Sequence, residues 1–271
     1  MTDWRLLRLE TNDAFTNMAI DEAVVAARNE GLVPNTLRFY RWKPSAVSIG
    51  RFQDVFNETH VENCQKHGVD IVRRITGGGA VYHDSEDEIT YSVVVREEDL
   101  GTKDVVVAYN TISNGIIEAS RILGVNADFS PGDPRNCPNI AIAGKKISGS
   151  AQFHKGGVFL QHGTFLLDVD LAKMFTFLKV PWAKTVTAVV CVAKEKVTSI
   201  KHELQSNISV EEAYKALIKG FQRAFNMQFE MEETLTGYER KLARKFRREK
   251  YTTEKWNLEG KMEKRKVVSK L

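Results

Sequence analysis

Three consecutive glycines, Gly77–Gly79, follow two arginines and separate two segments of extended-chain composition. Without side chains at a bend, backbone N–H groups can come close to a bound ligand. The guanidinium groups of Arg73 and Arg74, just before the bend, suit a carboxylate or a phosphate. The segment lacks both the Gly-Lys-Ser/Thr of a Walker loop and the glycine spacing of a Rossmann loop. It predicts an anion site at a bend; a flexible turn with a solvated arginine pair is the alternative.

A second cationic pair, Lys145 and Lys146, lies in an extended segment rich in glycine and serine. Alternation along a strand sends the two lysines to opposite faces, and Lys146 then shares its face with Ser148 and Ser150. A lysine on a small, polar face can neutralise a carboxylate and a phosphate together. The alternative is a hairpin with a basic tip.

The histidines and cysteines offer weaker signals. His83 and His162 lie in extended segments without a third ligand at metal spacing, so we expect hydrogen-bonded histidines rather than a zinc site. No Gly-x-Ser-x-Gly elbow supports serine hydrolysis. Cys137, in a proline-rich loop ahead of Lys146, is a candidate nucleophile if its setting is electropositive and accessible.

Helices and strands must position these residues. The order of the predicted helices and strands along the chain predicts an α+β fold with mixed, mostly antiparallel sheets flanked by helices. The chain has 271 residues, of which 42% are hydrophobic, and this suits one large domain or a domain with a small annex. Capping boxes at Ser209/Glu212 and Thr236/Glu239 begin two late helices. Other helices are predicted over 17–28, 58–67 and 103–123, and strands over 37–42, 46–50, 69–76, 80–83 and 89–95. A three-stranded meander is predicted over 140–143, 146–152 and 157–168.

Charge and cysteine usage point to a compartment and to partners. The three cysteines are an odd number without CxxC spacing, which suits a reducing cytoplasm. No signal peptide opens the chain, and its longest apolar stretch, around 188–193, is too short to span a membrane. Residues 238–271 hold 13 Lys and Arg against five Asp and Glu, although the whole chain has a net charge of only +4. This basic segment suits an acidic partner, nucleic acid or plain solvation.

Taken together and in order, the motifs resemble those of lipoate-protein ligases in the biotin/lipoate ligase superfamily. The resemblance extends over nearly the whole chain, from Asn17 to Asn257. Its core is the run from Arg73 through the glycines to Asp84, joined with 145–152 and with the stretch from Gln161 to Leu167.

The resemblance implies a two-step reaction in which lipoate and ATP, with Mg2+, form lipoyl-AMP before the lipoyl group passes to a lysine amine. No tightly bound cofactor is implied. Lys146 corresponds to the essential catalytic lysine, since adenylation needs positive charge between carboxylate and α-phosphate. The metal-binding residues are not identified by the resemblance. It places Arg74, Gly79, Ala80, Val81, Tyr82, Asn139 and Lys146 at the nucleotide, and Arg74, Gly77, Gly78, Gly79, His83 and Lys146 at lipoate.

The same resemblance predicts partners and domain limits. The acceptors implied are the lipoyl domains of 2-oxoacid dehydrogenase acyltransferase subunits and the glycine cleavage carrier protein. Many ligases continue with an accessory domain, whereas here a catalytic domain over 1–257 is followed only by a short basic tail over 258–271. We therefore expect a catalytic subunit that works with a separate accessory subunit.

Two alternatives remain. Octanoyl or lipoyl transferases of this superfamily use a cysteine acyl-enzyme, but their cysteine positions correspond here to Phe159 or Pro131, which leaves Cys137 as the candidate. A nucleic-acid-binding protein, a different class, is motivated by the basic segment alone.

Overall fold

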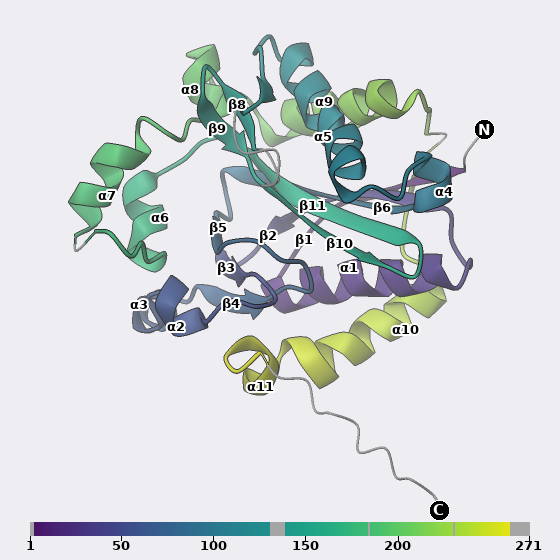
Figure 1. Ribbon diagram of the computed structural model, residues 1–271, viewed down its shortest axis with the longest axis horizontal. Helices are drawn as coiled ribbons and strands as arrows, with labels where there is room; N and C mark the ends of the chain where they lie inside the picture. Colours follow the sequence, from purple (N-terminus) through teal and green to yellow (C-terminus); the bar gives the residue numbers. More distant parts are fainter. Residues whose placement is uncertain (1–2, 131–138, 184, 230, 261–271) are drawn as a thin grey trace, which may run out of the picture.

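The computed structural model describes residues 3–130, 139–183, 185–229 and 231–260. A six-stranded sheet forms the centre, in the order β10-β11-β6-β2-β1-β12, with helices on both faces (Figure 1). Strand β1 runs parallel to β2 and β12, while β2, β6, β11 and β10 pair in antiparallel fashion. The strands are β1 (Trp4–Asn12), β2 (Asn35–Trp42), β6 (Glu88–Arg96), β10 (Ser150–Lys155), β11 (Val158–Leu166) and β12 (Glu232–Glu233).

Two smaller sheets flank the central one and carry the glycine loop and the lysine pair. One has the order β4-β3-β5, from β3 (Ala46–Ile49), β4 (Asp70–Arg73) and β5 (Val81–His83). The other has the order β7-β8-β9, from β7 (Asp128–Phe129), β8 (Ile140–Ile142) and β9 (Lys145–Ser148). These mixed, mostly antiparallel sheets and their helices confirm the predicted α+β fold.

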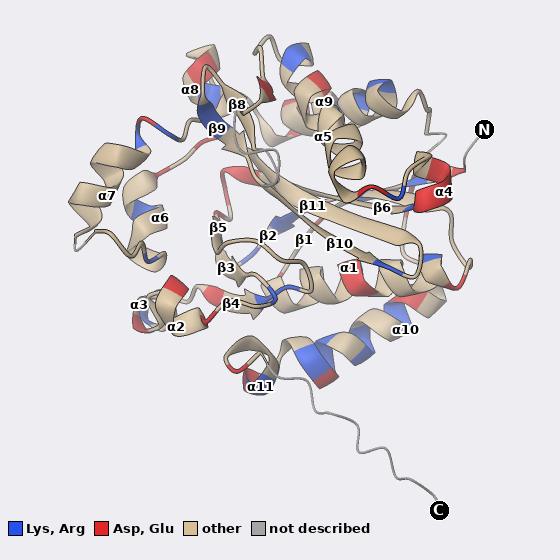
Figure 2. Ribbon diagram, viewed as in Figure 1, with Lys and Arg blue, Asp and Glu red and all other residues tan. Residues whose placement is uncertain are grey.

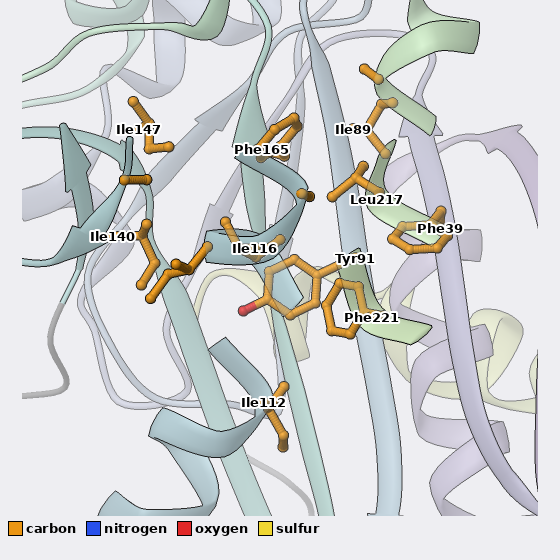
Figure 3. Packing of buried hydrophobic residues seen from close by; sticks show 14 of the residues in the cluster. Phe39, Ile89, Tyr91, Ile112, Ile116, Ile140, Ile147, Phe165, Leu217 and Phe221 are labelled. Carbon is orange, nitrogen blue, oxygen red and sulfur yellow. The ribbon is translucent and has the colours of Figure 1, made fainter. Parts of the chain in front are cut away.

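Helices cover both faces of the central sheet, and its long strands are buried on both sides. On one face, Phe39, Tyr91 and Phe165 pack with Ile116 and Phe221, which come from α5 (Val105–Ile122) and α9 (Val210–Phe225) (Figure 3). On the other, α1 (Ala14–Asn29) and α10 (Gly237–Phe246) bury a second cluster. The stretch of β6 over 88–95 is fully buried, but Glu88, Thr90 and Ser92 alternate with apolar residues, so one face of this strand is polar.

Shorter elements complete the fold. Both predicted capping boxes are present, at the starts of α9 and α10. A π-helical turn, η1 (Arg247–Tyr251), continues α10. The remaining helices are α2 (Val55–Glu58), α3 (Val61–Lys66), α4 (Glu97–Leu100), α6 (Leu171–Phe177), α7 (Val186–Ala193), α8 (Ile200–Leu204) and α11 (Glu254–Asn257). No helix in these described ranges is long and apolar enough to cross a bilayer.

The structure corrects two sequence-based elements. The helix predicted over 58–67 is shorter, because Thr59 is extended and α3 begins only at Val61, while the separate helix α2 ends at Glu58. The meander is not one sheet, because its middle strand breaks at Gly149 and the chain passes from the β7-β8-β9 sheet into the central sheet. Gly149 is held there by its N–H to Thr164 Oγ1 and its carbonyl to the N–H of Thr164.

Candidate functional site

A cavity of about 460 Å³ lies where the three sheets meet the glycine loop. Pockets of this size are typical of small-molecule sites. Its lining comes from α1, β2, β3, the loop and strand over 74–83, β6, β11, and both sides of the Gly149 break. The lining residues are Met18, Tyr40, Trp42, Ser48, Arg74, Gly78, Gly79, Ala80, Val81, His83, Thr90, Asn139, Lys146, Gly149, Ser150, Ala151, His162, Gly163 and Thr164.

Lys146 enters this cavity from β9. Its main chain is held to the segment 196–198 by two hydrogen bonds, from Lys146 N to the carbonyl of Lys196 and from Thr198 N to the carbonyl of Lys146. Its ammonium lies so close over Gly149 that a Cβ there would be 2.5 Å from Nζ. Burial, and then the charge of Arg74, lower the pKa of Lys146. The described residues place no carboxylate beside this ammonium.

Arg74 is a second buried cation in the cavity wall, and protein oxygens satisfy its whole guanidinium. Nε donates to Thr76 Oγ1 at 3.0 Å, and one terminal nitrogen donates to the carbonyl and hydroxyl of Ser48 at 3.0 and 3.2 Å. The other terminal nitrogen donates to the carbonyls of Gly77 and Gly79, each at 2.7 Å. Burial lowers the pKa of Arg74 to about 10, so the group stays charged at neutral pH.

The two predicted histidines lie on either side of Arg74, each within a chain of hydrogen bonds. His83 joins Ser48 Oγ, 2.8 Å from Nε2, to Glu88, 2.8 Å from Nδ1. His162 joins Thr76 Oγ1, 2.8 Å from Nε2, to Asp21, 2.9 Å from Nδ1. The prediction of hydrogen-bonded histidines is confirmed.

Burial decides the charge state at His162. It lowers the pKa of the His162 imidazole and favours the neutral form. Burial also acts to raise the pKa of Asp21, but hydrogen bonds from His162 and Arg38 hold the pKa of that carboxyl below its usual range. The pair is therefore a neutral imidazole beside a carboxylate.

Aromatic and apolar side chains form the remaining wall. Alternation on β2 turns Tyr40 and Trp42 to one face, where Trp42 stacks on His83 with centroids 4.0 Å apart. Met18 of α1 and Ala80 and Val81 beside β5 add apolar surface. A cavity with an apolar wall and two cations suits a ligand that has a hydrocarbon chain and an anionic end.

Most of the predicted site residues gather here. Arg74, Gly78, Gly79, Ala80, Val81, His83, Asn139 and Lys146 all line the cavity. Gly77 does not, although its carbonyl holds Arg74. Tyr82 does not either, because alternation on β5 turns Val81 and His83 inward and Tyr82 outward, where it stacks on Phe177.

Several lining residues escaped the sequence-based prediction. Ser48 is not among the predicted site residues, and His162 is expected only as a hydrogen-bonded histidine, because nothing local shows that they face Arg74. Asp21 and Glu88, which orient the histidines, are acidic residues in a helix and a strand, and nothing local distinguishes them. Their partners lie elsewhere in the chain, so only an accurate pairing of distant elements could have identified them.

The cysteines are placed unevenly. Cys64 is buried beneath the β4-β3-β5 sheet, where burial raises the pKa of its thiol to about 11. Cys191 is exposed on α7, and neither lines the cavity. Phe159 is fully buried in the main core. Cys137 and Pro131 lie outside the described residues.

Comparison with known proteins gives one consistent result. Residues 13–222 match the family model described as "Lipoyl protein ligase A/B catalytic domain". An octanoyltransferase LipM from Brevibacillus brevis is 36% identical over 277 residues, covering 95% of this chain and 99% of the relative.

The bipartite lipoate protein ligase of Thermoplasma acidophilum, described with its E2 lipoyl domain, superposes with a TM-score of 0.85 at 33% identity, covering 97% of this chain and 98% of that one. A lipoate-protein ligase A bound with ATP gives 0.81 at 33% identity, covering 94% and 98%. The expected superfamily is thereby confirmed. The chain belongs to the family of lipoyl protein ligase A/B catalytic domains.

Proposed function

We propose that the protein is an octanoyltransferase that moves an octanoyl group from a carrier thioester to the lysine amine of a lipoyl domain. The curated relatives support this choice, which the sequence analysis kept as an alternative to ATP-dependent ligation. The observation that carries it is the ammonium of Lys146, held over Gly149 at one side of a largely apolar cavity and without a carboxylate partner among the described residues.

This arrangement suits acyl transfer. The nucleophile is the lysine amine of the acceptor, or an enzyme thiol that then passes the octanoyl group to that amine. In each attack the carbonyl oxygen becomes an oxyanion, and a fixed cation in a cavity of low dielectric stabilises that charge. The carbon–sulfur bond then breaks, and the proton lost by the nucleophile passes to the departing sulfur, so the carrier leaves as a thiol and the amide is the product. The apolar wall holds the octanoyl chain throughout.

An ATP-dependent lipoate ligase is the second candidate. The positive charge of two buried cations without a carboxylate partner in the described ranges, Arg74 and Lys146, also suits the phosphate of an acyl adenylate. A transferase route through an acyl-enzyme would require a cysteine at the cavity. None of the described residues that line the cavity is a cysteine. Under this reading ATP and Mg2+ are substrates, and a separate accessory subunit is expected.

One experiment separates the two candidates. A lipoyl domain is incubated with the protein and either octanoyl-loaded acyl carrier protein, or octanoate or lipoate with ATP and Mg2+, and its mass is followed. We expect octanoylation from the carrier without ATP. Lys146→Ala should slow it by about 100-fold or more, whereas Lys145→Ala is the matched control, because Lys145 lies outside the cavity lining.

The other outcomes are equally clear. Modification that needs ATP and releases pyrophosphate, with or without an accessory ligase subunit, would replace the transferase by the ligase. No modification in any mixture would refute both. Within the transferase reading, an acyl-enzyme mass that disappears in Cys137→Ala would identify that thiol as the intermediate carrier.

A further inference from the structure

Arg74 has no N–H left for a ligand. A guanidinium has five N–H donors, and the five oxygens that accept from Arg74 all belong to the protein. A side chain that binds a substrate anion directly needs at least one donor facing the cavity. The role of Arg74 must therefore be sought in what it holds.

It holds the glycine loop. One terminal nitrogen binds the carbonyls of Gly77 and Gly79 and so bends the chain around Gly78, whose φ is +87°. A Cβ at Gly78 would lie 3.1 Å from that nitrogen. The loop also sits against Gly50, where a Cβ would be 2.0 Å from the carbonyl oxygen of Gly78. The bend is thus packed on both sides.

Two matching chains fix the guanidinium itself. Thr76 Oγ1 accepts a hydrogen bond from Arg74 Nε, so the Thr76 hydroxyl can donate its proton to His162 Nε2. Because Nε2 then accepts, the proton of the neutral imidazole lies on Nδ1, which donates to Asp21. Ser48 Oγ accepts from Arg74 in the same way, and its proton points to His83 Nε2, with Glu88 beyond. This proton placement follows from the hydrogen-bond network.

Both chains end in carboxylates that are themselves held. Asp21 accepts a hydrogen bond from Arg38 at 2.7 Å, and Glu88 accepts one from the hydroxyl of Thr90 at 2.6 Å. All these groups are buried, which makes a broken chain costly, since an unpaired polar group in the interior costs about 1–3 kcal/mol. The arrangement leaves Arg74 a single orientation.

We propose that Arg74 is a positioning residue. Held by the Ser48–His83–Glu88 and Thr76–His162–Asp21 chains, it keeps the loop over 76–79 in its binding shape. The anionic end of the ligand then meets Lys146 and the cavity-facing edge of the loop, inside the field of Arg74 but without a hydrogen bond from it. The inference depends on the proposed function only for the identity of the ligand.

The test uses the ligand-free protein and two substitutions at Thr76. Thr76→Val keeps the shape of the side chain but removes the hydroxyl, whereas Thr76→Ser keeps the hydroxyl. We expect Thr76→Val to raise amide hydrogen exchange over 75–80 at least tenfold, with exchange in β6 and β11 unchanged. Thr76→Ser should stay within threefold of wild type.

Activity and spectroscopy supply further readouts. In the transfer assay, Thr76→Val should lower kcat/KM about tenfold and Thr76→Ser should restore it. The imidazole nitrogen shifts of His162 should report a neutral ring protonated on Nδ1. If the wild type shows no transfer at all, the proposed function fails, while loop exchange and the histidine shifts still decide the inference.

Two results would overturn it. Loop exchange in Thr76→Val that equals the wild type would show that the Thr76 chain does not hold the loop. A His162 ring protonated on Nε2 would contradict the proton directions. Should Thr76→Val not fold, Ser48→Ala removes the other hydroxyl beside Arg74 and carries the same expectation for residues 75–80.

Discussion

At the scale of single residues, the site depends on where two charges are held. Lys146 lies over a glycine, and Arg74 is enclosed by main-chain and hydroxyl oxygens. Burial disfavours the charged form of both side chains and lowers the pKa of each. A bound anion would stabilise the charged form of both side chains, so the cavity favours an anionic ligand.

Gly149→Ala tests the position of Lys146. The new Cβ would meet Nζ at 2.5 Å, and because the far end of a lysine is flexible, the ammonium should move while the backbone stays. A shift of about 1 Å in a catalytic group can cost roughly 100-fold in rate. We expect kcat to fall by about 10- to 100-fold with a nearly unchanged Tm. A loss of Tm matching the loss of activity would instead show that Gly149 serves the fold.

At the scale of elements, the closest helix packing lies on the face of the sheet away from α1 and α10. Helices α5 and α9 cross where each has a glycine. A Cβ on Gly220 would lie 2.5 Å from Ala119 N and from the carbonyl oxygen of Gly115, and one on Gly115 would meet the ring of Phe221. The two glycines therefore set how closely α9 approaches the core that supports β6 and β11.

Gly220→Ala should force the two helices apart, because the obstructing atoms belong to the backbone. Overpacking of this kind costs about 1–3 kcal/mol, partly offset by the better helix propensity of alanine, about 1 kcal/mol. We expect the free energy of unfolding to fall by up to about 2 kcal/mol, measured by urea denaturation. Gly237→Ala is the control, since nothing lies within 4 Å of its new Cβ. Equal stability of both variants would contradict the close crossing.

At the scale of the whole molecule, positive charge is concentrated on one helix. Lys and Arg gather along α10 (Figure 2), and Lys241, Arg244 and Lys245 on it are exposed. Three aromatic residues of the same region, Phe246, Tyr251 and Trp256, pack against the α1 side of the molecule, whereas Tyr238 is exposed. The face of α10 left to solvent is therefore rich in basic residues, as electrostatic steering of an acidic protein requires.

Charge reversal tests this steering. Lys241→Glu with Lys245→Glu should raise KM for the lipoyl domain about fivefold at low salt and leave kcat unchanged, because rim charges act mainly on encounter. The effect should vanish at ~1 M salt, where screening is strong. Lys219→Glu with Arg223→Glu on α9 makes the same charge change on the opposite face. Equal effects of the two pairs, or none, would show that α10 is solvated surface.

The sequence alone determined the family, the fold class and a core set of the cavity-lining residues. These signals are local, because a bend needs glycines, a helix start needs a capping box, and a strand alternates its faces. Gly78, His83 and Lys146 could each be singled out from the residues beside them. The basic segment was equally readable, since charge is counted directly from residue types.

The tertiary structure decided what those residues touch. His162 and Asp21 are 141 positions apart, and their contact depends on how α1 packs on β11. The outward turn of Tyr82 and the break at Gly149 likewise follow from which sheet each strand joins. Arg74 is the plainest case. Its residue type suggests an anion ligand, but whether its donors are free depends on oxygens brought to it from β3 and the loop, which no local pattern specifies.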